Sequence, residues 1–281
     1  MDKIQVGVIA EHGYAPETMA ALARLTQRGH NIKTLEDIKE LWQKPASDNL
    51  IKAMMKMELH GTIKRFTPIT IAIVGASRRF LAQARTNQVG FNYVSASLQY
   101  SNYGDTADFV VPYEIMKADA ERIETIYGDD KPILEVSSTM YQDTYLRSCK
   151  DAMCTYRILA SDIDNDTAGY AAPQGLRNIL IMQGNHEAWL HFIKTRTCNR
   201  NTVETQYVAL RIWEELLKTQ GGEEMFAFAG PDCMYGRCRE GKMCCGEPMK
   251  RFAADAYPDD APSIPRRIIN EKWPLLKDVK S

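Results

Sequence analysis

The sequence predicts a mixed α/β fold for most of its 281 residues. Short apolar runs rich in β-branched residues recur along the chain, and each is too short for a stable helix. Longer segments between them place apolar residues every three or four positions, which is the period of an amphipathic helix. No segment repeats in tandem, so the alternation favours one domain in which helices pack on a sheet.

The N-terminal part begins with a strand and continues with three helices. Residues 4–10 (IQVGVIA) are apolar and β-branched, which is typical of a strand. Pro16 opens the first helix and Gly29 ends it, at the positions where proline and glycine usually occur. In the next two helices, TLEDIKELWQK and SDNLIKAMMKM, Thr34 and Ser47 are the expected N-caps.

The centre of the chain returns to a strand and then to a helix. Ile69, Ile71 and Ile73 alternate with smaller residues, which predicts a strand. This strand enters a helix near Ser77, and the helix leads into an extended polar segment.

The second half contains more helices, one more strand and an unusual tail. Helical periodicity marks residues 111–127 and, more clearly, 139–159. LRNILIMQ predicts a buried strand, and NHEAWLHFIKTR and TVETQYVALRIWEELLK predict two further helices. Gly, Pro and Cys are frequent from Gly221 onward. We therefore expect a main domain over residues 1–220 and a Cys-rich extension over residues 221–281.

Composition argues against several functional classes. The chain has 35 Lys and Arg against 36 Asp and Glu, so no overall positive field favours nucleic acid or an anionic membrane. No apolar run approaches the roughly 18 residues of a membrane span, and the N-terminal segment lacks the pattern of a signal peptide. We therefore expect a cytoplasmic protein whose cysteines are mostly thiols or metal ligands.

The segment from Ser77 to Ser101 contains no carboxylate. Arg85 supplies positive charge, and helix ends and extended backbone offer N–H groups that suit phosphate. The amides and hydroxyls of the segment are those of Gln83, Asn87, Gln88, Asn92, Gln99, Ser95, Ser97 and Ser101. Such a set predicts a site for an anionic, heteroaromatic ligand, because amides can hydrogen-bond the edges of a base or a flavin ring. The alternative is an ordinary polar surface segment.

The order of residues resembles the flavin-dependent thymidylate synthase family. That family carries RHR-x-x-S-x-N-x-x-S-x-R-Y after a His-x-Thr, a strand, a Ser-Arg and a Gln. The matching positions in the first half are His60, Thr62, Ser77, Arg78, Gln83, Ser97, Tyr100 and Ser101. Those in the second half are Pro173, Asn185, Phe192, Arg196 and Glu204. The resemblance covers roughly residues 1–218.

Several family arginines are replaced in this chain. The RHR motif has no single counterpart, because its alignment depends on which flanking residue is used for counting. Gln99 and Gly169 stand where the family has arginine. Arg65 stands in place of a glutamate and Glu187 in place of an arginine, which predicts a swapped ion pair if the two lie close together. The remaining candidates for binding phosphate are Arg78, Arg85, Arg177 and Arg196.

The resemblance implies a reductive methylation of dUMP to dTMP. It implies FAD as cofactor, methylenetetrahydrofolate and NAD(P)H as co-substrates, a mostly antiparallel sheet and a homotetramer with ligands bound where subunits meet. The expected nucleotide residues are Gln83, Arg85, Ser95, Ser97, Gln99, Tyr100 and Arg196. The expected flavin residues are His60, Thr62, Asn87, Gln88, Asn185 and His191, although both histidines are also compatible with a structural role.

Two other hypotheses remain open. The first is a relative that methylates or hydroxymethylates another pyrimidine nucleotide, such as dCMP or UMP. The second is a non-catalytic paralogue that keeps the scaffold and binds a nucleotide or a partner.

The tail contains four closely spaced cysteines, Cys233, Cys238, Cys244 and Cys245. Four sulfur atoms suit tetrahedral zinc or an iron–sulfur centre. Their spacing lacks the C-x-x-C pairs of a zinc ribbon, however. A metal site, redox sensing and a simple reduced lid therefore remain alternatives.

Overall fold

One four-stranded antiparallel sheet organises the protein. The computed structural model describes residues 3–11, 13–56, 61–105, 107–119, 141–226, 229–235 and 238–246. The strands are β1 (Gln5–Ala10), β2 (Ile69–Ser77), β3 (Phe91–Ser95) and β4 (Arg177–Gly184), in the spatial order β1-β2-β4-β3. Every adjacent pair is antiparallel. The predicted α/β class with a mostly antiparallel sheet is confirmed.

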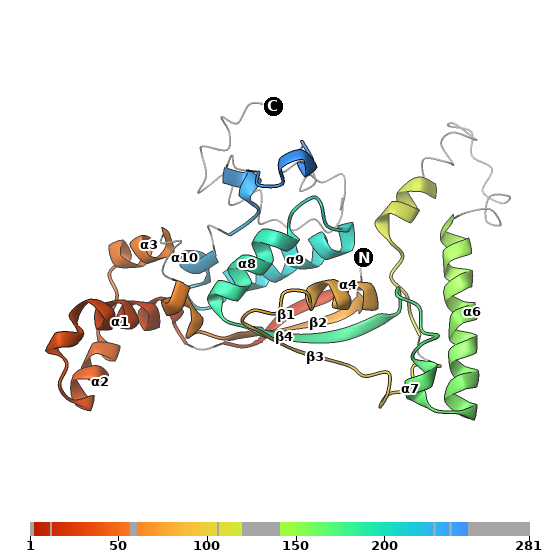
Figure 1. The fold of residues 1–281 in the computed structure, drawn as a ribbon, viewed down its shortest axis with the longest axis horizontal. Helices are drawn as coiled ribbons and strands as arrows, with labels where there is room; N and C mark the ends of the chain where they lie inside the picture. Colours follow the sequence, from red (N-terminus) through yellow and green to blue (C-terminus); the bar gives the residue numbers. More distant parts are fainter. Residues whose placement is uncertain are drawn as a thin grey trace.

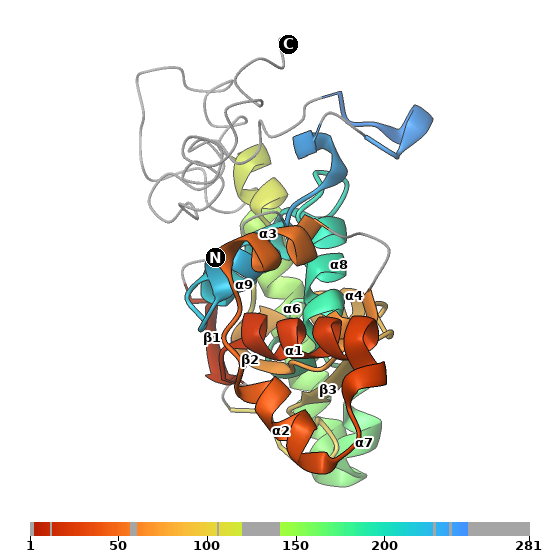
Figure 2. The ribbon, with the colours of Figure 1, turned by 90° about the vertical axis from the view of Figure 1, so that its left-hand side faces the viewer.

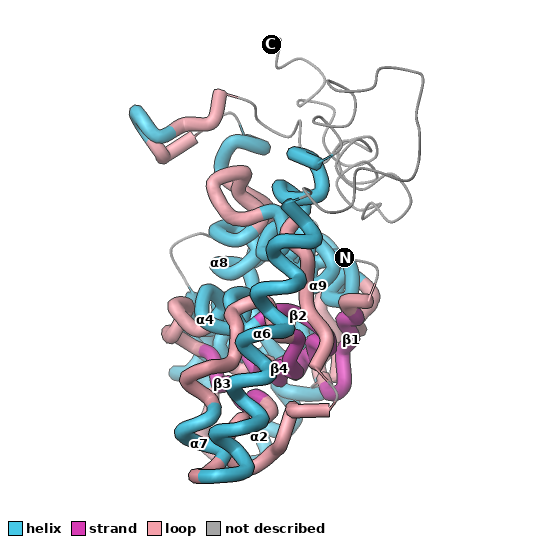
Figure 3. The backbone as a smooth tube through the Cα atoms, turned by 90° about the vertical axis from the view of Figure 1, so that its right-hand side faces the viewer, coloured by secondary structure: helices cyan, strands magenta, loops and turns pink. Residues whose placement is uncertain are grey.

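The helices gather on one face and at both ends of the sheet (Figure 1). They are α1 (Ala15–Arg28), α2 (Leu35–Gln43), α3 (Asp48–Lys56), α4 (Arg78–Ala84), α6 (Tyr141–Asp162), α7 (Asn165–Ala168), α8 (His186–Arg196), α9 (Val203–Leu217) and α10 (Gly222–Phe226). Figure 2 shows α1 to α3 at one end, and Figure 3 shows α6 and α7 at the other. None of the described helices is both long and apolar enough to cross a bilayer.

Helix N-caps form where the sequence predicts them. The Thr34 hydroxyl accepts from the Asp37 N–H at 3.3 Å, and the Asp37 carboxylate accepts from the Thr34 N–H at 2.8 Å, which completes a capping box. The Ser47 hydroxyl accepts from the Leu50 N–H at 3.4 Å at the start of α3. These contacts satisfy backbone donors that a helix start otherwise leaves unpaired.

The main core lies between one sheet face and the helices α8 and α9. Ile73 of β2 and Leu180 of β4 are fully buried there, together with Trp213 of α9. Side chains alternate between the two faces of a strand, so the neighbouring residues Val74 and Ile179 point the other way and are about two-fifths exposed. The second sheet face therefore carries apolar side chains that no described element covers.

A second, smaller core lies beside α6. Met153 and Tyr156 of α6 pack there against Ala168, Ala172 and Leu176. This core anchors the segments that follow β3 and α7. The two cores are therefore linked by loops rather than by a continuous sheet.

The region around residue 220 extends the main core. Met225, Phe226 and Ala229 are buried in it, and the Trp213 indole N–H donates to the Phe226 carbonyl at 2.9 Å. The division of the chain at residue 220 stays a prediction. Of the helix predicted over residues 111–127, the described part is helical at residues 113–119.

A buried histidine at the start of α8 makes stability depend on pH. Neither ring nitrogen of His186 has a partner among the described residues. Burial, assisted by the Lys64 charge, holds the pKa of His186 well below its usual 6.5. Below pH 6.5 the unfolded chain therefore binds a proton that the folded chain does not bind. The free energy of unfolding should fall by about 1.4 kcal/mol for each unit by which the pH is lowered in this range.

Urea unfolding between pH 5 and pH 8 measures this dependence. We expect His186→Leu to flatten the acidic side of the profile, whereas His30→Gln at an exposed position should not change it. If the free energy of unfolding depends equally on pH in wild type and in His186→Leu, His186 is not the cause of the pH dependence.

Candidate functional site

A large cleft lies between the two cores, where the carboxylate-free segment meets α7 and the loop after it. It has a volume of about 700 Å³, which falls within the range of about 300–1,000 Å³ typical of small-molecule sites. One wall is formed by α4 and Arg85, and the residues that follow β3 add a second wall. Its polar lining consists of Arg78, Arg85, Ser95, Ser97, Gln99, Asp166, Tyr170, Gln174 and Asn178.

Two arginines stand at opposite ends of α4 and line this cleft. The Arg78 guanidinium donates to the carbonyls of Ala172 at 2.6 Å and Gly169 at 3.5 Å. Arg85 donates to the Ser95 hydroxyl at 2.5 Å. Neither arginine has a carboxylate partner among the described residues. The cleft therefore contains two arginines that form no ion pair with a described acid, although the Asp166 carboxylate also lines it.

The start of α4 offers no free N–H group, contrary to the expectation that this helix end would bind phosphate through its backbone. The N–H groups of Arg78 and Arg79 donate to the carbonyls of Leu176 and Gln174, both at 3.0 Å. The N–H of Phe80 donates to the Ser77 hydroxyl at 3.1 Å. An anion in the cleft would therefore be bound mainly by side chains.

A third arginine, Arg196 at the end of α8, lies beside the cleft rather than in its lining. It donates to the Thr86 hydroxyl and, at 3.2 Å, to the Asn201 side chain. With the Asn87 amide turned so that its oxygen faces Arg196, that oxygen accepts from Nε and Nη2 at 2.9 Å each. Burial lowers the pKa of Arg196 from its ordinary value. All of these partners are neutral.

The Tyr93 hydroxyl lies within the electrostatic influence of both Arg85 and Arg196. Its hydroxyl lies near the carbonyls of Asn87, at 2.5 Å, and Ala84, at 3.0 Å. Burial raises the pKa of Tyr93 to about 12, and the charges of Arg196 and Arg85 partly oppose this rise. Both arginines therefore act on the same small region at the end of α4.

Comparison with known proteins identifies the family. The family model described as "Thymidylate synthase complementing protein" (Thy1) matches residues 8–220. The chain belongs to this family. Its curated relatives include the "Flavin-dependent thymidylate synthase" of Clostridium tetani, which is 25% identical over 181 residues, covering 63% of this chain and 69% of the relative. The protein of the same name from Geobacter sulfurreducens is 23% identical over 238 residues, covering 83% and 91%.

Solved structures support the Thy1 fold. Thymidylate Synthase X of Helicobacter pylori, solved with FAD and dUMP, matches with a TM-score of 0.54 and 15% identity, covering 79% of this chain and 97% of that one. The UMP/dUMP methylase PolB of Streptomyces cacaoi, bound with 5-Br dUMP, matches with a TM-score of 0.57 and 19% identity, covering 81% and 96%. The sequence predictions of family, fold and an enzyme are confirmed.

The cleft brings four of the seven predicted nucleotide residues together. These are Arg85, Ser95, Ser97 and Gln99. The other three lie outside its lining. The Gln83 side-chain oxygen Oε1 accepts from the hydroxyls of Thr202, at 3.4 Å, and Thr205. This side chain therefore links α4 to the start of α9. Tyr100 is 83% exposed and Arg196 lies in the neighbouring cluster, so the roles of all seven stay predictions.

The five predicted flavin residues that the structure describes lie outside the cleft lining. Thr62, Gln88 and His191 are exposed, and His60 falls outside the described residues. The Asn185 side chain accepts from the Ala188 N–H at 2.9 Å and caps α8. The Asn87 side-chain oxygen, in its turned orientation, accepts from the Arg196 guanidinium. These six assignments also stay predictions.

Helix α7 and the loop after it contribute residues that the sequence predictions missed. Asp166, Tyr170 and Gln174 line the cleft, although they are about 70 residues from the segment opposite. In the sequence, only the polar break SDIDNDTAG and the Pro-Gln-Gly that follows it mark this region as a loop, and neither indicates a binding site. Arg177, a predicted phosphate candidate, instead pairs with Asp108 at 3.3 Å and donates to the Gly75 carbonyl at 2.7 Å.

The swapped ion pair forms as predicted. The Arg65 Nε lies 2.5 Å from the Glu187 Oε2. This contact joins the short helix η2 (Gly61–Arg65) to α8. The exchange of both residues thus keeps a link that the family motif suggests at these positions.

The described part of the Cys-rich extension contacts α8 through Asp232. Asp232 pairs with Lys194 at 2.6 Å and with Arg239 at 3.2 Å. Burial, with smaller contributions from neighbouring cysteines, raises the pKa of Cys233 to about 11. No group of three or more His, Cys, Asp or Glu residues within the described ranges is arranged to hold a metal ion. The nature of this segment stays open.

Proposed function

We propose that this member of the Thy1 family is a flavin-dependent enzyme that converts dUMP to dTMP. Methylenetetrahydrofolate would supply the one-carbon unit and NAD(P)H the reducing equivalents. The observation that carries the proposal is the cleft with two arginines, Arg78 and Arg85, whose printed partners are carbonyl and hydroxyl oxygens and not carboxylates. The names of the curated relatives support the reaction type.

The arginines suit the phosphate of a nucleotide. A phosphate monoester needs charge-assisted donors, and a guanidinium offers several N–H groups in a fixed plane. Arg78 uses part of its donor set on two carbonyls, and Arg85 uses one N–H on Ser95. The remaining donors of both residues are available to bind and orient a phosphate group.

The other cleft residues suit a pyrimidine nucleoside. Ser97, Gln99 and Gln174 supply hydroxyl and amide groups, which can donate and accept at the polar edge of a base. Leu81 and Ala82 supply apolar surface for the ring on the α4 side. In this account the protein orients the base and excludes water, and no protein nucleophile is needed.

A second set of polar residues, outside the cleft lining, fits a flavin. Thr62, Gln88 and His191 are exposed, and hydroxyl, amide and imidazole groups match the carbonyl and imine edges of an isoalloxazine. Together with His60, Asn87 and Asn185, they are the residues that we propose to hold FAD. Bound FAD supplies hydride chemistry once it has been reduced.

We further propose a homotetramer in which sites are completed between subunits. The described flavin candidates lie outside the cleft lining, so we propose that a second copy supplies the missing wall. The uncovered sheet face offers an apolar surface for association, with Val94 68% exposed on the same face as Val74 and Ile179.

A second candidate substrate is UMP. The fold is also similar to that of PolB, whose printed description is a UMP/dUMP methylase. Gln99 replaces an arginine expected from the family resemblance, so the base or sugar contacts of this chain differ from the family pattern. Substrate choice within the pyrimidine nucleotides is therefore part of the test.

Product analysis tests the proposal. Purified protein is loaded with FAD and incubated with methylenetetrahydrofolate, NADPH and either dUMP, UMP or dCMP. We expect an oxidised-flavin absorption band and a product one methyl group heavier than dUMP by mass spectrometry. A hydroxymethyl product would support the related alternative reaction.

Two results would contradict the proposal. One is a colourless protein that takes up no FAD. The other is a flavin-loaded protein that leaves all three nucleotides unchanged while a curated relative methylates dUMP under the same conditions.

A further inference from the structure

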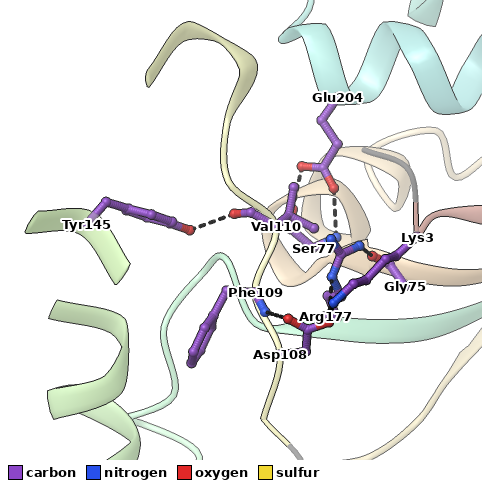
Figure 4. Close-up of polar contacts among 9 residues, drawn as sticks. All are labelled: Lys3, Gly75, Ser77, Asp108, Phe109, Val110, Tyr145, Arg177 and Glu204. Carbon is purple, nitrogen blue, oxygen red and sulfur yellow. Dashed lines mark hydrogen bonds and ion pairs between the residues drawn. The ribbon is translucent and has the colours of Figure 1, made fainter. Parts of the chain in front are cut away.

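The buried link between α9 and α4 lies behind the cleft. Glu204, in the first turn of α9, accepts from the Ser77 backbone N–H at 2.7 Å and from the Ser77 hydroxyl at 2.6 Å. Figure 4 shows the carboxylate pointing from α9 toward Ser77, with Arg177 and Val110 nearby. The same Ser77 hydroxyl accepts from the Phe80 N–H and caps α4. One carboxylate thus fixes the residue that starts α4.

The contacts of Ser77 explain why a carboxylate stands at position 204. The Ser77 hydroxyl oxygen already accepts from Phe80, so its own hydrogen is directed to Glu204. The backbone N–H of Ser77 is a second donor toward the same side chain. Two donors need two acceptors, and a carboxylate provides both, whereas a glutamine amide provides one.

Packing alone does not hold this end of α4. A cavity of about 270 Å³ lies against it, lined by Ser77, Arg79 and Glu204 together with residues of α6. Gln174 lines both this cavity and the cleft. The other side of α4 buries Phe80, Leu81 and Ala84 in the main core, so the hydrogen bonds of Ser77 fix the start of the helix on the side of the cavity.

Two hydrogen bonds and one charged group support the ionised form of Glu204 against its burial. Burial raises the pKa of the carboxyl above its usual value, and the two Ser77 hydrogen bonds and the charge of Arg177 oppose this rise. Arg177 is in turn held by Asp108, which also pairs with Lys3 at 2.9 Å (Figure 4). The charge of Arg177 in β4 therefore acts on Glu204, and Asp108 links Arg177 to Lys3, just before β1.

We infer that Glu204 is a positioning residue for the cleft: by holding Ser77 it sets the place of α4, and with it the two arginines at the ends of that helix. Arg78 follows Ser77 directly, and Arg85 follows the last residue of α4. A shift of the helix start would move both guanidinium groups relative to the loop at residues 169–174. The inference rests on the proposed function for its consequence, but its structural part is independent of it.

Hydrogen exchange tests the structural part without any ligand. In Glu204→Gln and Glu204→Ala proteins we expect the amides of residues 77–80 to exchange about tenfold faster or more than in wild type, because a bond that limits opening is lost. Glu214→Gln is the matched control, since Glu214 lies on the same helix and pairs with Arg211 at 2.8 Å. Unchanged exchange at residues 77–80 in both Glu204 variants would overturn the inference.

Steady-state kinetics test the functional part in the FAD-loaded protein. We expect Glu204→Gln to raise the KM for dUMP about tenfold while kcat changes less than about threefold, as for a lost binding geometry. Ser77→Ala removes the hydroxyl partner, so its effect and that of Glu204→Gln should not add in the double variant. A lower kcat with unchanged KM, or additive effects, would overturn the role through Ser77.

The exchange and kinetic experiments together distinguish a failure of the inference from a failure of the proposed function. If no pyrimidine nucleotide binds to the wild-type protein, the proposed function fails. The positioning of α4 would still be decided by the exchange data. Faster exchange without any change in the KM for dUMP would overturn the link between Glu204 and the cleft.

Discussion

Replacing Arg78 by alanine is expected to raise the KM for the pyrimidine nucleotide about 100-fold, because a charge-assisted hydrogen bond to phosphate contributes up to about 3 kcal/mol. The variant also loses the contacts of Arg78 with the carbonyls of Ala172 and Gly169, which close one side of the cleft. Arg78→Lys should restore part of the affinity, since it keeps the charge but not the planar donor set. Initial rates at varied dUMP concentration measure the effect.

The neighbouring arginine provides a matched control. Arg79 lies on the same turn of α4 but lines the cavity behind the helix instead of the cleft. Arg79→Ala should therefore change the KM for dUMP less than about threefold. Equal losses in Arg78→Ala and Arg79→Ala would mean that the general charge of α4, rather than the cleft, attracts the nucleotide.

Adding a methyl group at Gly175 is expected to lower the free energy of unfolding by about 3 kcal/mol, the upper part of the range for overpacking. A Cβ at this position would overlap the Tyr145 hydroxyl and lie 3.3 Å from the Val110 carbonyl. That hydroxyl donates to the Val110 carbonyl at 2.9 Å, so it cannot move away without losing a partner. Urea unfolding of Gly175→Ala measures the cost.

A second substitution tests the cause of this loss. In the Tyr145→Phe background the colliding hydroxyl is absent, so Gly175→Ala should cost less than about 1 kcal/mol there. Gly7→Ala is the control, because no atom lies within 4 Å of a Cβ added at that strand position. If Gly175→Ala is equally costly with and without the Tyr145 hydroxyl, the clash is not the reason.

Local sequence patterns predicted the elements of the fold well. The alternation at Ile69, Ile71 and Ile73 marks β2 because a strand buries every second side chain, and all three are buried. Thr34 and Ser47 were predicted as N-caps because their hydroxyls can accept from N–H groups within the same turn. These features depend on neighbours within a few residues, so the sequence alone carries the information.

The candidate site was predictable only in part. The absence of carboxylates from residues 77–101 pointed to Arg85, Ser95, Ser97 and Gln99, which do line one cleft. The opposite wall could not be predicted, because the contact between this segment and Tyr170 or Gln174 spans about 70 residues and has no local signal. The sheet and the small core beside α6 create that contact.

Polar side chains were also ambiguous without the fold. An amide can face a ligand or another element equally well, and Gln83 is used for Thr202 and Thr205 of the α9 start. The first N–H groups of α4 could have bound an anion, but the carbonyls of Leu176 and Gln174 occupy them. In both cases a long-range partner decides the role of a group whose chemistry allows several.

The most direct test of the central claim is a crystal structure of the protein with dUMP and FAD. We predict that the phosphate lies within hydrogen-bonding distance of the Arg78 and Arg85 guanidinium groups, with the base beside Ser97 and Gln99. A nucleotide bound on another surface, with its phosphate away from both arginines, would contradict the account.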